Sequence, residues 1–238
     1  MDYPSVEDVT FANHIDPAQS IAAYHCSSHN LKAIRNQLLR SHPSGSRLLK
    51  MQGAHFGWTE IEECYNRDVL RQPQISKLRQ ASVQVDSYST MCVSYAKAPS
   101  ARETLMELCL FLADALMCSM QLKDLDLGNA KKIYKNLIPV FRSKMTPHTA
   151  YHIKSALNTL EYTSVVGAIF NEFFLNSKVM ITQDNINAYE STIKAFVDEF
   201  YDQWYKSLDA SIMRKDRQKH FISSITYKNL RLSMRGFF

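Results

Sequence analysis

The chain has 238 residues, of which 45% are hydrophobic, 21% charged and 11% aromatic, and its formal net charge is +5. This composition excludes disordered and fibrous proteins, and the length allows one large domain or two small ones, of which we expect one. With 6 glycines and 7 prolines, few residues are available for the many turns of a strand-rich fold, so a few long helices are favoured.

The N-terminal residues and the cysteines bear on the compartment. The first 20 residues contain four acidic residues and no Lys or Arg, so they lack the basic start and apolar run of a secretory signal. The five cysteines are odd in number and unevenly spaced, which does not favour a disulfide framework. We therefore expect a cytoplasmic or nuclear protein that is neither secreted nor transmembrane.

The first predicted helix begins at Asp16-Pro17, which supply an N-cap and a first helical residue, and it has a break near Ser28. Thr59 and Glu62 have the spacing of a capping box, and apolar residues at helical spacing follow as far as Val69. Residues 75–95 fit both a helix and a strand, and we favour a helix.

Ser100 and Glu103 form a second capping-box spacing, and the sequence is apolar on nearly every face from Leu105 to Leu122. Because Glu107 and Asp114 interrupt this run, a buried core helix is favoured over a membrane span. A buried Asp114 would be costly unless paired, so we expect it to contact a basic residue or to lie at a helix interface.

In the second half, a helix from Ala130 should bend or end near Pro139, and Thr146-Pro147 should start the next one. The last clear pattern is an apolar stripe from Ile186 to Ile212. The sequence thus predicts an all-α fold, a single compact domain of about seven to nine helices around a buried central helix near residues 103–122.

This predicted fold divides into a helical core domain at residues 1–210, with a soft boundary near residue 127, and a basic amphipathic C-terminal segment at residues 211–238. No repeated period or long polar linker requires a further division.

The net charge conceals three basic segments, which are the strongest functional signal in the chain. Residues 21–50 carry five cations and no acidic residue, residues 127–160 carry six and none, and residues 211–238 carry seven and one. The rest of the chain is net acidic. Clustered Lys and Arg can bind phosphates, and bases can stack on aromatic rings among them.

The candidate nucleic-acid contacts are the cations of these segments and two tyrosines between them. They are Lys131, Lys132, Lys135, Arg142, Lys144, Lys154, Tyr134, Tyr151, Lys32, Arg35, Arg40, Arg214, Lys215, Arg217 and Lys219. A purely structural reading competes with this one, because basic and acidic segments can face each other across helix interfaces, and most aromatics are core residues.

For metal ligation, the best candidates are His25, Cys26 and His29, since histidines four residues apart on a helix can share an ion. The paired cysteine spacing of structural zinc sites is absent, so ordinary helix residues are favoured and we expect no metal. Motifs for nucleotide, hydrolytic or deaminase chemistry are also absent, so we expect neither a cofactor nor an enzyme.

The leading hypothesis is a non-enzymatic protein that binds RNA or single-stranded nucleic acid with low sequence specificity. Under this hypothesis the protein would self-associate and serve as a coat or nucleoprotein-like packaging protein, for example in a virus. The alternatives are a helical adaptor that binds a protein partner through the amphipathic C-terminal region, and a peripheral membrane or matrix-like protein with its basic tail on anionic lipid. Among these partners, we favour nucleic acid over a protein or a membrane, and RNA over DNA. We also expect self-association.

Overall fold

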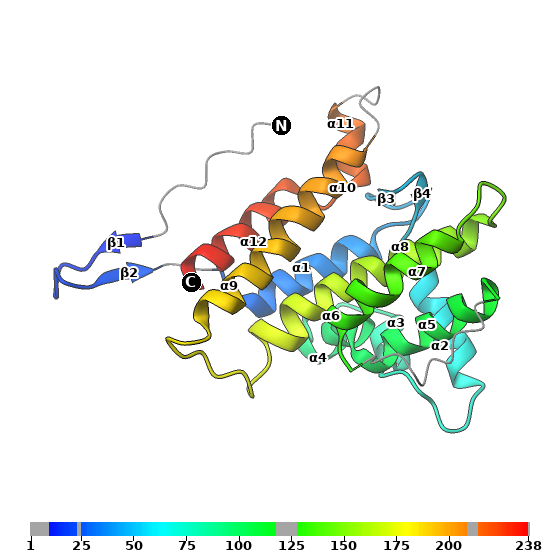
Figure 1. Cartoon of the computed structure of the whole chain (residues 1–238), viewed down its shortest axis with the longest axis horizontal. Helices are drawn as coiled ribbons and strands as arrows, with labels where there is room; N and C mark the ends of the chain where they lie inside the picture. Colours follow the sequence, from blue (N-terminus) through cyan, green and yellow to red (C-terminus); the bar gives the residue numbers. More distant parts are fainter. Residues whose placement is uncertain (1–9, 23–24, 118–127, 209–213, 238) are drawn as a thin grey trace.

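The computed structural model describes residues 10–22, 25–117, 128–208 and 214–237 (Figure 1). It is 65% helical and 3% strand, with the helices in one compact arrangement, so the all-α prediction is confirmed. The predicted boundary near residue 127 lies outside the described residues.

An antiparallel hairpin, and no helix, forms around Asp16. Strand β1 (Thr10–Ala12) pairs with β2 (Ser20–Ala22), and the backbone of Gln19 donates to the Asp16 carbonyl in the connecting turn. The prediction of a helix from Asp16 is wrong because an Asp-Pro pair starts a turn as readily as a helix. Helix α1 (Ser27–Leu39) begins eleven residues later, near the predicted break.

The next elements are two short strands and a helix. Strands β3 (Lys50–Met51) and β4 (Ala54–His55) form a hairpin, and α2 (Thr59–Val69) follows. The predicted helix is confirmed, but its cap is not the predicted one, because the Gly57 backbone N–H donates to Glu60 Oε2.

The ambiguous region after α2 contains only short helical pieces. They are α3 (Gln80–Val83), the 3₁₀ turn η1 (Ser89–Met91), α4 (Val93–Lys97) and the 3₁₀ turn η2 (Ala98–Ser100). Helix α5 (Arg102–Ala115) follows without a capping box, since Ser100 Oγ donates to the Lys97 carbonyl. The end of the predicted apolar run, residues 118–122, falls outside the described residues.

The second half consists of continuous helices with π-helical segments inside them. Helix α6 (Ala130–Lys132), the π segment η3 (Ile133–Leu137) and α7 (Ile138–Lys144) form one continuous helix. Pro139, near which the sequence predicted a bend or an end, is the second residue after the π segment, where the regular hydrogen bonding of an α-helix is already interrupted. Helix α8 (Tyr151–Val166) continues into η4 (Gly167–Phe174), and α9 (Ile186–Lys194) continues through η5 (Ala195–Phe200) into α10 (Tyr201–Ser207).

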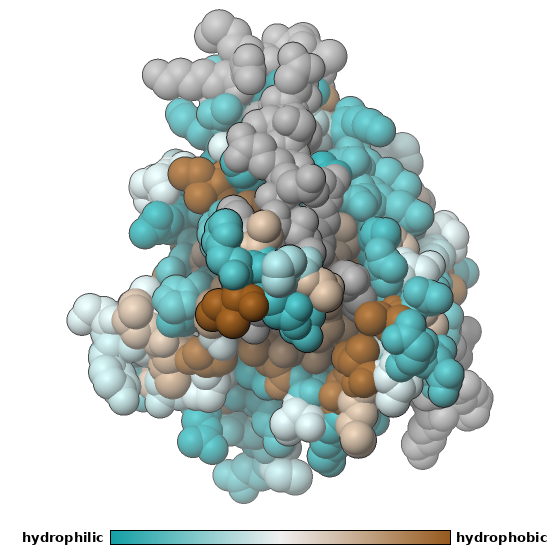
Figure 2. All heavy atoms as spheres, turned by 90° about the vertical axis from the view of Figure 1, so that its left-hand side faces the viewer, coloured by the Kyte–Doolittle hydropathy of each residue, from teal (hydrophilic) through white to brown (hydrophobic). Residues whose placement is uncertain are grey.

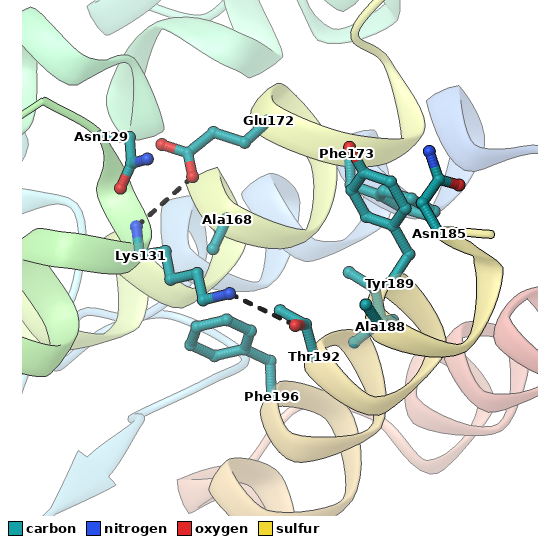
Figure 3. A pocket seen from close by; sticks show the side chains of 11 residues that line it. Asn129, Lys131, Ala168, Glu172, Phe173, Asn185, Ala188, Tyr189, Thr192 and Phe196 are labelled. Atoms are coloured by element: carbon teal, nitrogen blue, oxygen red, sulfur yellow. Dashed lines mark hydrogen bonds between the residues drawn. The ribbon is translucent and has the colours of Figure 1, made fainter. Parts of the chain in front are cut away.

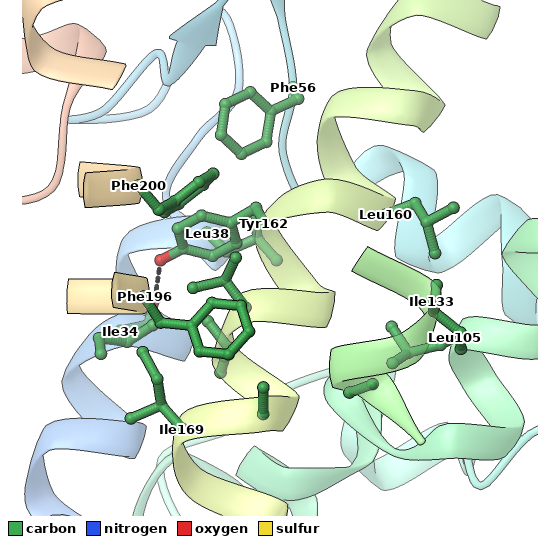
Figure 4. Close-up of a cluster of buried hydrophobic side chains, with 14 of the residues drawn as sticks. Ile34, Leu38, Phe56, Leu105, Ile133, Leu160, Tyr162, Ile169, Phe196 and Phe200 are labelled. Carbon is green, nitrogen blue, oxygen red and sulfur yellow. Dashed lines mark hydrogen bonds between the residues drawn. The ribbon is translucent and has the colours of Figure 1, made fainter. Parts of the chain in front are cut away.

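The core is centred on α8 and η4, and α5 packs against α8. Every residue from Ser155 to Phe170 is buried, so this stretch is covered on all sides. The Tyr162 ring packs against the rings of Phe56 and Trp204, with centroids 5.5 and 5.8 Å away, and its hydroxyl donates to the Ile34 carbonyl of α1 (Figure 4). The aromatic side chains thus join α8 to α1 and to the long α9–α10 helix.

The C-terminal helices pack onto the same body. After α11 (Arg214–Arg217) and the 3₁₀ turn η6 (Gln218–His220), α12 (Ser224–Phe237) lies along α1 (Figure 1). Asn30 Nδ2 donates to Ser233 Oγ at 2.7 Å, and the Tyr227 hydroxyl donates to Asp202 Oδ1 at 2.7 Å. Much of the apolar side of the C-terminal region is therefore covered within the chain, although Ile225 is exposed.

The buried carboxylate of α5 is Glu107, which is fully buried and forms an ion pair with Arg71. Asp114, by contrast, is exposed, so the expectation that it would be paired or at an interface is wrong. The apolar run covers so many faces of α5 that its pattern does not distinguish the two positions. Of the helices in the described ranges, none combines the length and the apolar character that a membrane span needs.

Candidate nucleic-acid interface

The β3–β4 hairpin has a two-residue turn in which Gln52 and Gly53 have φ values of 47° and 81°. Positive φ at both central residues is typical of a type I′ turn, whose twist matches that of the strands, and glycine adopts it without strain. From α8, Asn158 Nδ2 donates to the Met51 carbonyl at 2.6 Å and to the Ala54 carbonyl at 3.0 Å. The hairpin is therefore held in a fixed position.

Ser41 organises the loop that leads from α1 to this hairpin. Its hydroxyl donates to the Phe56 carbonyl at 2.5 Å and accepts from the Leu49 N–H at 2.9 Å. Gly57 lies against the same residue, because a Cβ there would be 1.9 Å from the Ser41 carbonyl oxygen. Close packing thus fixes both ends of residues 41–57.

This loop pairs with η6, which is more than 170 residues away in the sequence. The Leu48 N–H donates to the Lys219 carbonyl at 2.9 Å, and the Leu48 carbonyl lies 2.7 Å from His220 Nδ1. Arg47 donates to the Gln218 carbonyl at 2.5 Å. The first and third basic segments therefore meet, as a convergent phosphate-binding surface requires.

The middle basic segment reaches the same place through the start of α8. The Tyr151 hydroxyl accepts from the His55 N–H at 2.7 Å, which fixes the side chain, yet 54% of Tyr151 is exposed. The rings of His55 and His220 are 5.4 Å apart. In Figure 1, β3, β4, α11 and the start of α8 accordingly lie at one end of the molecule.

We call this surface the basic end and define it by four cations, three histidines and one aromatic ring. Its members are Arg40, Arg47, Lys50, Lys219, His42, His55, His220 and Tyr151. No Asp or Glu occurs between residues 17 and 59 or between 127 and 160. Asp216 is a neighbouring carboxylate, 4.0 Å from Lys219 Nζ, and both side chains are exposed to solvent, so this pair leaves Lys219 accessible.

The pKa values reflect a positive surface. Burial lowers the pKa of His55, and the adjacent His220 and Lys50 lower it further. Burial also lowers the pKa of Arg47, with a contribution from Arg40. Because the cations disfavour each other, an anion bound among them would relieve repulsion.

Two predicted contacts of the basic segments are instead structural. Arg142 forms an ion pair with Glu161 and donates to Asn158 Oδ1 at 2.6 Å, so it supports the side chain that holds the hairpin. Arg35 is buried and donates to the Thr90 carbonyl at 2.7 Å, and burial lowers the pKa of its guanidinium.

The cations at the start of the middle segment lie apart from the basic end. Lys131 Nζ donates to Thr192 Oγ1 at 3.2 Å, Lys132 is half-buried and Lys135 is exposed. Tyr134 packs on the rings of Phe196 and Phe200, 5.4 and 6.0 Å away, and burial raises the pKa of its hydroxyl to about 12. Its ring is therefore part of the core and not a free platform for a base.

The remaining predicted contacts have different environments. Lys144 is exposed and Lys32 half-buried, Lys154 Nζ donates to the Pro147 carbonyl at 3.0 Å, and Arg217 donates to the Leu208 carbonyl at 2.9 Å. Arg214 and Lys215 begin α11, where the structure describes their backbone alone.

The metal candidates are at the start of α1. Cys26 is an exposed free thiol, and hydrogen bonds with His29 lower its pKa to about 7. In the described part of the chain, no group of three or more His, Cys, Asp or Glu side chains could hold a metal ion.

None of the three histidines, His42, His55 and His220, was identified from the sequence as a candidate for this surface. His42 lies within an acid-free stretch, and that signal could have pointed to it. His220 is placed by the contact of its ring Nδ1 with the Leu48 carbonyl, next to the backbone hydrogen bond between Leu48 and Lys219, and the sequence gives no sign of either.

Comparison with known proteins gives little further information. No family model matches the chain, and no curated protein matches it. Among solved structures, it is similar to a chain of the Drosophila P element transposase strand transfer complex, with a TM-score of 0.38 and 14% identity, over 98% of this chain and 55% of that chain. The chain thus spans about half the length of that relative, and we draw no conclusion from so low a similarity.

Proposed function

We propose that this protein is a non-enzymatic binder of single-stranded nucleic acid, with RNA favoured, and that the basic end is its binding surface. The observation that carries the proposal is the pairing of Leu48 with Lys219 and His220, which joins the first and third basic segments. A surface with several cations and few carboxylates attracts a phosphate backbone.

The chemistry of the surface supports low sequence specificity. Arg40, Lys50 and Lys219 would contact phosphates as charges, and such contacts position a strand without reading its bases. The exposed ring of Tyr151 offers one face on which any base can stack. Because a duplex shields its base faces, the stacking favours single strands.

We further propose that the protein self-associates through its N-terminal hairpin. Strands β1 and β2 extend beyond the helices (Figure 1), and an isolated two-stranded hairpin is marginally stable in water. Figure 2 views this end and shows separate hydrophobic areas on a mostly hydrophilic surface. Ile15 in the connecting turn is 96% exposed. Residues 1–20 carry four acidic residues and no Lys or Arg, which complements a basic surface on a second copy.

Light scattering after size exclusion tests the self-association. The wild type should increase in mass with concentration, and Ile15→Asp should shift this increase to higher concentration, whereas Gln19→Asp in the same exposed turn should not. A wild type that is monomeric at every concentration would contradict this part of the proposal.

The alternatives have less support from particular contacts. An adaptor that uses the amphipathic C-terminal region would need a free apolar face, and α12 covers most of that face by packing on α1. A lipid-binding surface would share the cations but would not need the ring of Tyr151.

Fluorescence anisotropy with a labelled single-stranded RNA, over a salt series, tests the nucleic-acid proposal. Log affinity should fall linearly with log salt, by about 0.7 for each neutralised phosphate. Duplex of the same length should bind more weakly, and vesicles of anionic lipid should not compete effectively. Absence of binding at low salt, or equal binding to anionic vesicles, would contradict the proposal.

A further inference from the structure

A second site lies where the start of α6 faces η4 and α9. It is a pocket of about 440 Å³, within the usual size range for small-molecule sites, and no residue of the basic end lines it (Figure 3). An inference drawn from it therefore does not depend on the proposed function.

The walls of this pocket are largely apolar and aromatic. Ala168, Ile193 and Phe196 contribute apolar surface, and Phe173 and Tyr189 lie together at one end with their ring centroids 5.0 Å apart. Aromatic rings prefer offset or edge-to-face neighbours at such distances, so a further planar ring would find favourable contacts here.

A single ammonium group reaches the centre of the pocket. The Lys131 side chain extends across it, and Nζ donates to Thr192 Oγ1 at 3.2 Å (Figure 3). An ammonium has three donors, and this neutral hydroxyl uses one of them. Among the described residues, no carboxylate forms an ion pair with Lys131, so its charge is available to a ligand.

Glu172, the acidic residue of the lining, has another role. Its carboxylate accepts from the backbone N–H groups of Ala130 and Lys131 and so caps the start of α6. Burial raises the pKa of Glu172, whereas these two hydrogen bonds and the Lys131 charge lower it. The hydrogen-bond partners of Glu172 are thus backbone groups, and the Lys131 ammonium is the group of the lining that would attract an anion.

We propose that this pocket binds a small molecule that has one aromatic ring and one carboxylate or phosphate group. The ring would lie against Phe173, Tyr189 and Phe196, and the anion would contact Lys131 Nζ and the Thr192 hydroxyl. Placing an unpaired cation beside aromatic walls selects against neutral and cationic ligands of the same shape.

Amide-detected NMR titration of the full chain tests the proposal, with benzoate, phenyl phosphate and benzyl alcohol as probes. The two anions should shift the amides of Lys131 and Thr192 saturably, and benzyl alcohol should bind about tenfold more weakly because it lacks the charge. Equal binding of the alcohol, or saturable shifts elsewhere only, would overturn the proposal.

Three variants sharpen this test. Ala188 is exposed at the pocket, so Ala188→Trp should abolish binding, whereas Asn187→Trp, on the same helix but outside the lining, should bind as the wild type does. Lys131→Met should remove the preference for anions and retain weak binding of the ring. Unchanged binding by Ala188→Trp, or a retained anion preference in Lys131→Met, would contradict the site.

The same chemistry could come from a free molecule or from one nucleotide of a strand. Displacement of phenyl phosphate by a single-stranded oligonucleotide would assign the pocket to a nucleotide, and its absence would assign it to a free small molecule. In both cases the ligand has one aromatic ring and one anionic group, as proposed. Because Ala188→Trp leaves the basic end intact, a loss of small-molecule binding at the pocket can be distinguished from a loss of nucleic-acid binding at the basic end.

Discussion

The basic end and the start of the middle basic segment contain the same residue types, yet the fold treats them differently. At the basic end, Lys219 and Arg40 remain exposed, and Tyr151 presents an open ring. Around α6 and α7, Arg142 is paired with Glu161, and Tyr134 is packed between aromatic core residues. A run of cations therefore remains accessible to a partner only where no buried carboxylate and no core contact engages it.

The largest expected effect comes from a change in the packing that supports the basic end. Gly57→Ala would place a Cβ 1.9 Å from the Ser41 carbonyl oxygen and should lower the free energy of unfolding by about 3 kcal/mol. Gly53→Ala has open space around it and only the strain of a positive φ, so we expect about 1 kcal/mol. Urea unfolding measures both, and equal losses would contradict the packing described for Ser41.

Substitutions of the two tyrosines of the middle segment should have different effects, one on stability and the other on binding. Tyr134→Ala removes a half-buried ring that packs on the core and should cost about 2 kcal/mol of stability, with binding unchanged under conditions where the variant is folded. Tyr151→Ala should weaken single-strand binding by about 1 to 3 kcal/mol, because a stacking face is lost.

Tyr151→Phe is the matched control for this pair, since it keeps the ring and loses only the hydroxyl that accepts from His55. Anisotropy titrations and urea unfolding on the same samples separate the two effects. If Tyr151→Phe and Tyr151→Ala bind equally weakly, stacking is not the role of this residue.

A smaller effect concerns pH. The pKa of His55 is lower in the folded chain than its ordinary value of 6.5, so the folded state disfavours the charged ring. The stability contributed by neutral His55 is fully present above about pH 6.5, and it is lost as the pH falls from there through the lowered pKa of the folded state. His55→Gln should reduce this loss by less than about 1 kcal/mol, because the ring is partly exposed to solvent. Urea unfolding between about pH 8 and pH 5 measures the free energy of unfolding of the wild type and of His55→Gln. If the two free energies change in parallel with pH, this prediction is wrong.

Much of the helical framework was predictable because apolar periodicity records burial directly. The helix from Thr59 to Val69 follows such a pattern, and only its cap was misassigned, since Glu60 and not Glu62 reaches back to a backbone N–H, that of Gly57. Asp16 was misread because turns and helix starts use the same residue types.

The candidate surface was only partly predictable. The three basic segments indicated Arg40, Lys219 and Tyr151 from the sequence alone. The sequence could not show that Leu48 pairs with Lys219, because two backbone groups far apart in the chain leave no residue pattern. Nor could it separate Tyr134 from Tyr151, since both lie in the same acid-free segment with lysines nearby.

The most direct test of the central claim compares two double charge reversals in the salt series. Lys50→Glu with Lys219→Glu changes the basic end, whereas Lys135→Glu with Lys178→Glu makes the same change in net charge at exposed positions outside it. We predict that the first pair lowers the slope of log affinity against log salt by about 1.4, for two lost phosphate contacts, and that the second pair leaves the slope near the wild-type value. Equal slopes for the two double variants would contradict a binding surface at the basic end.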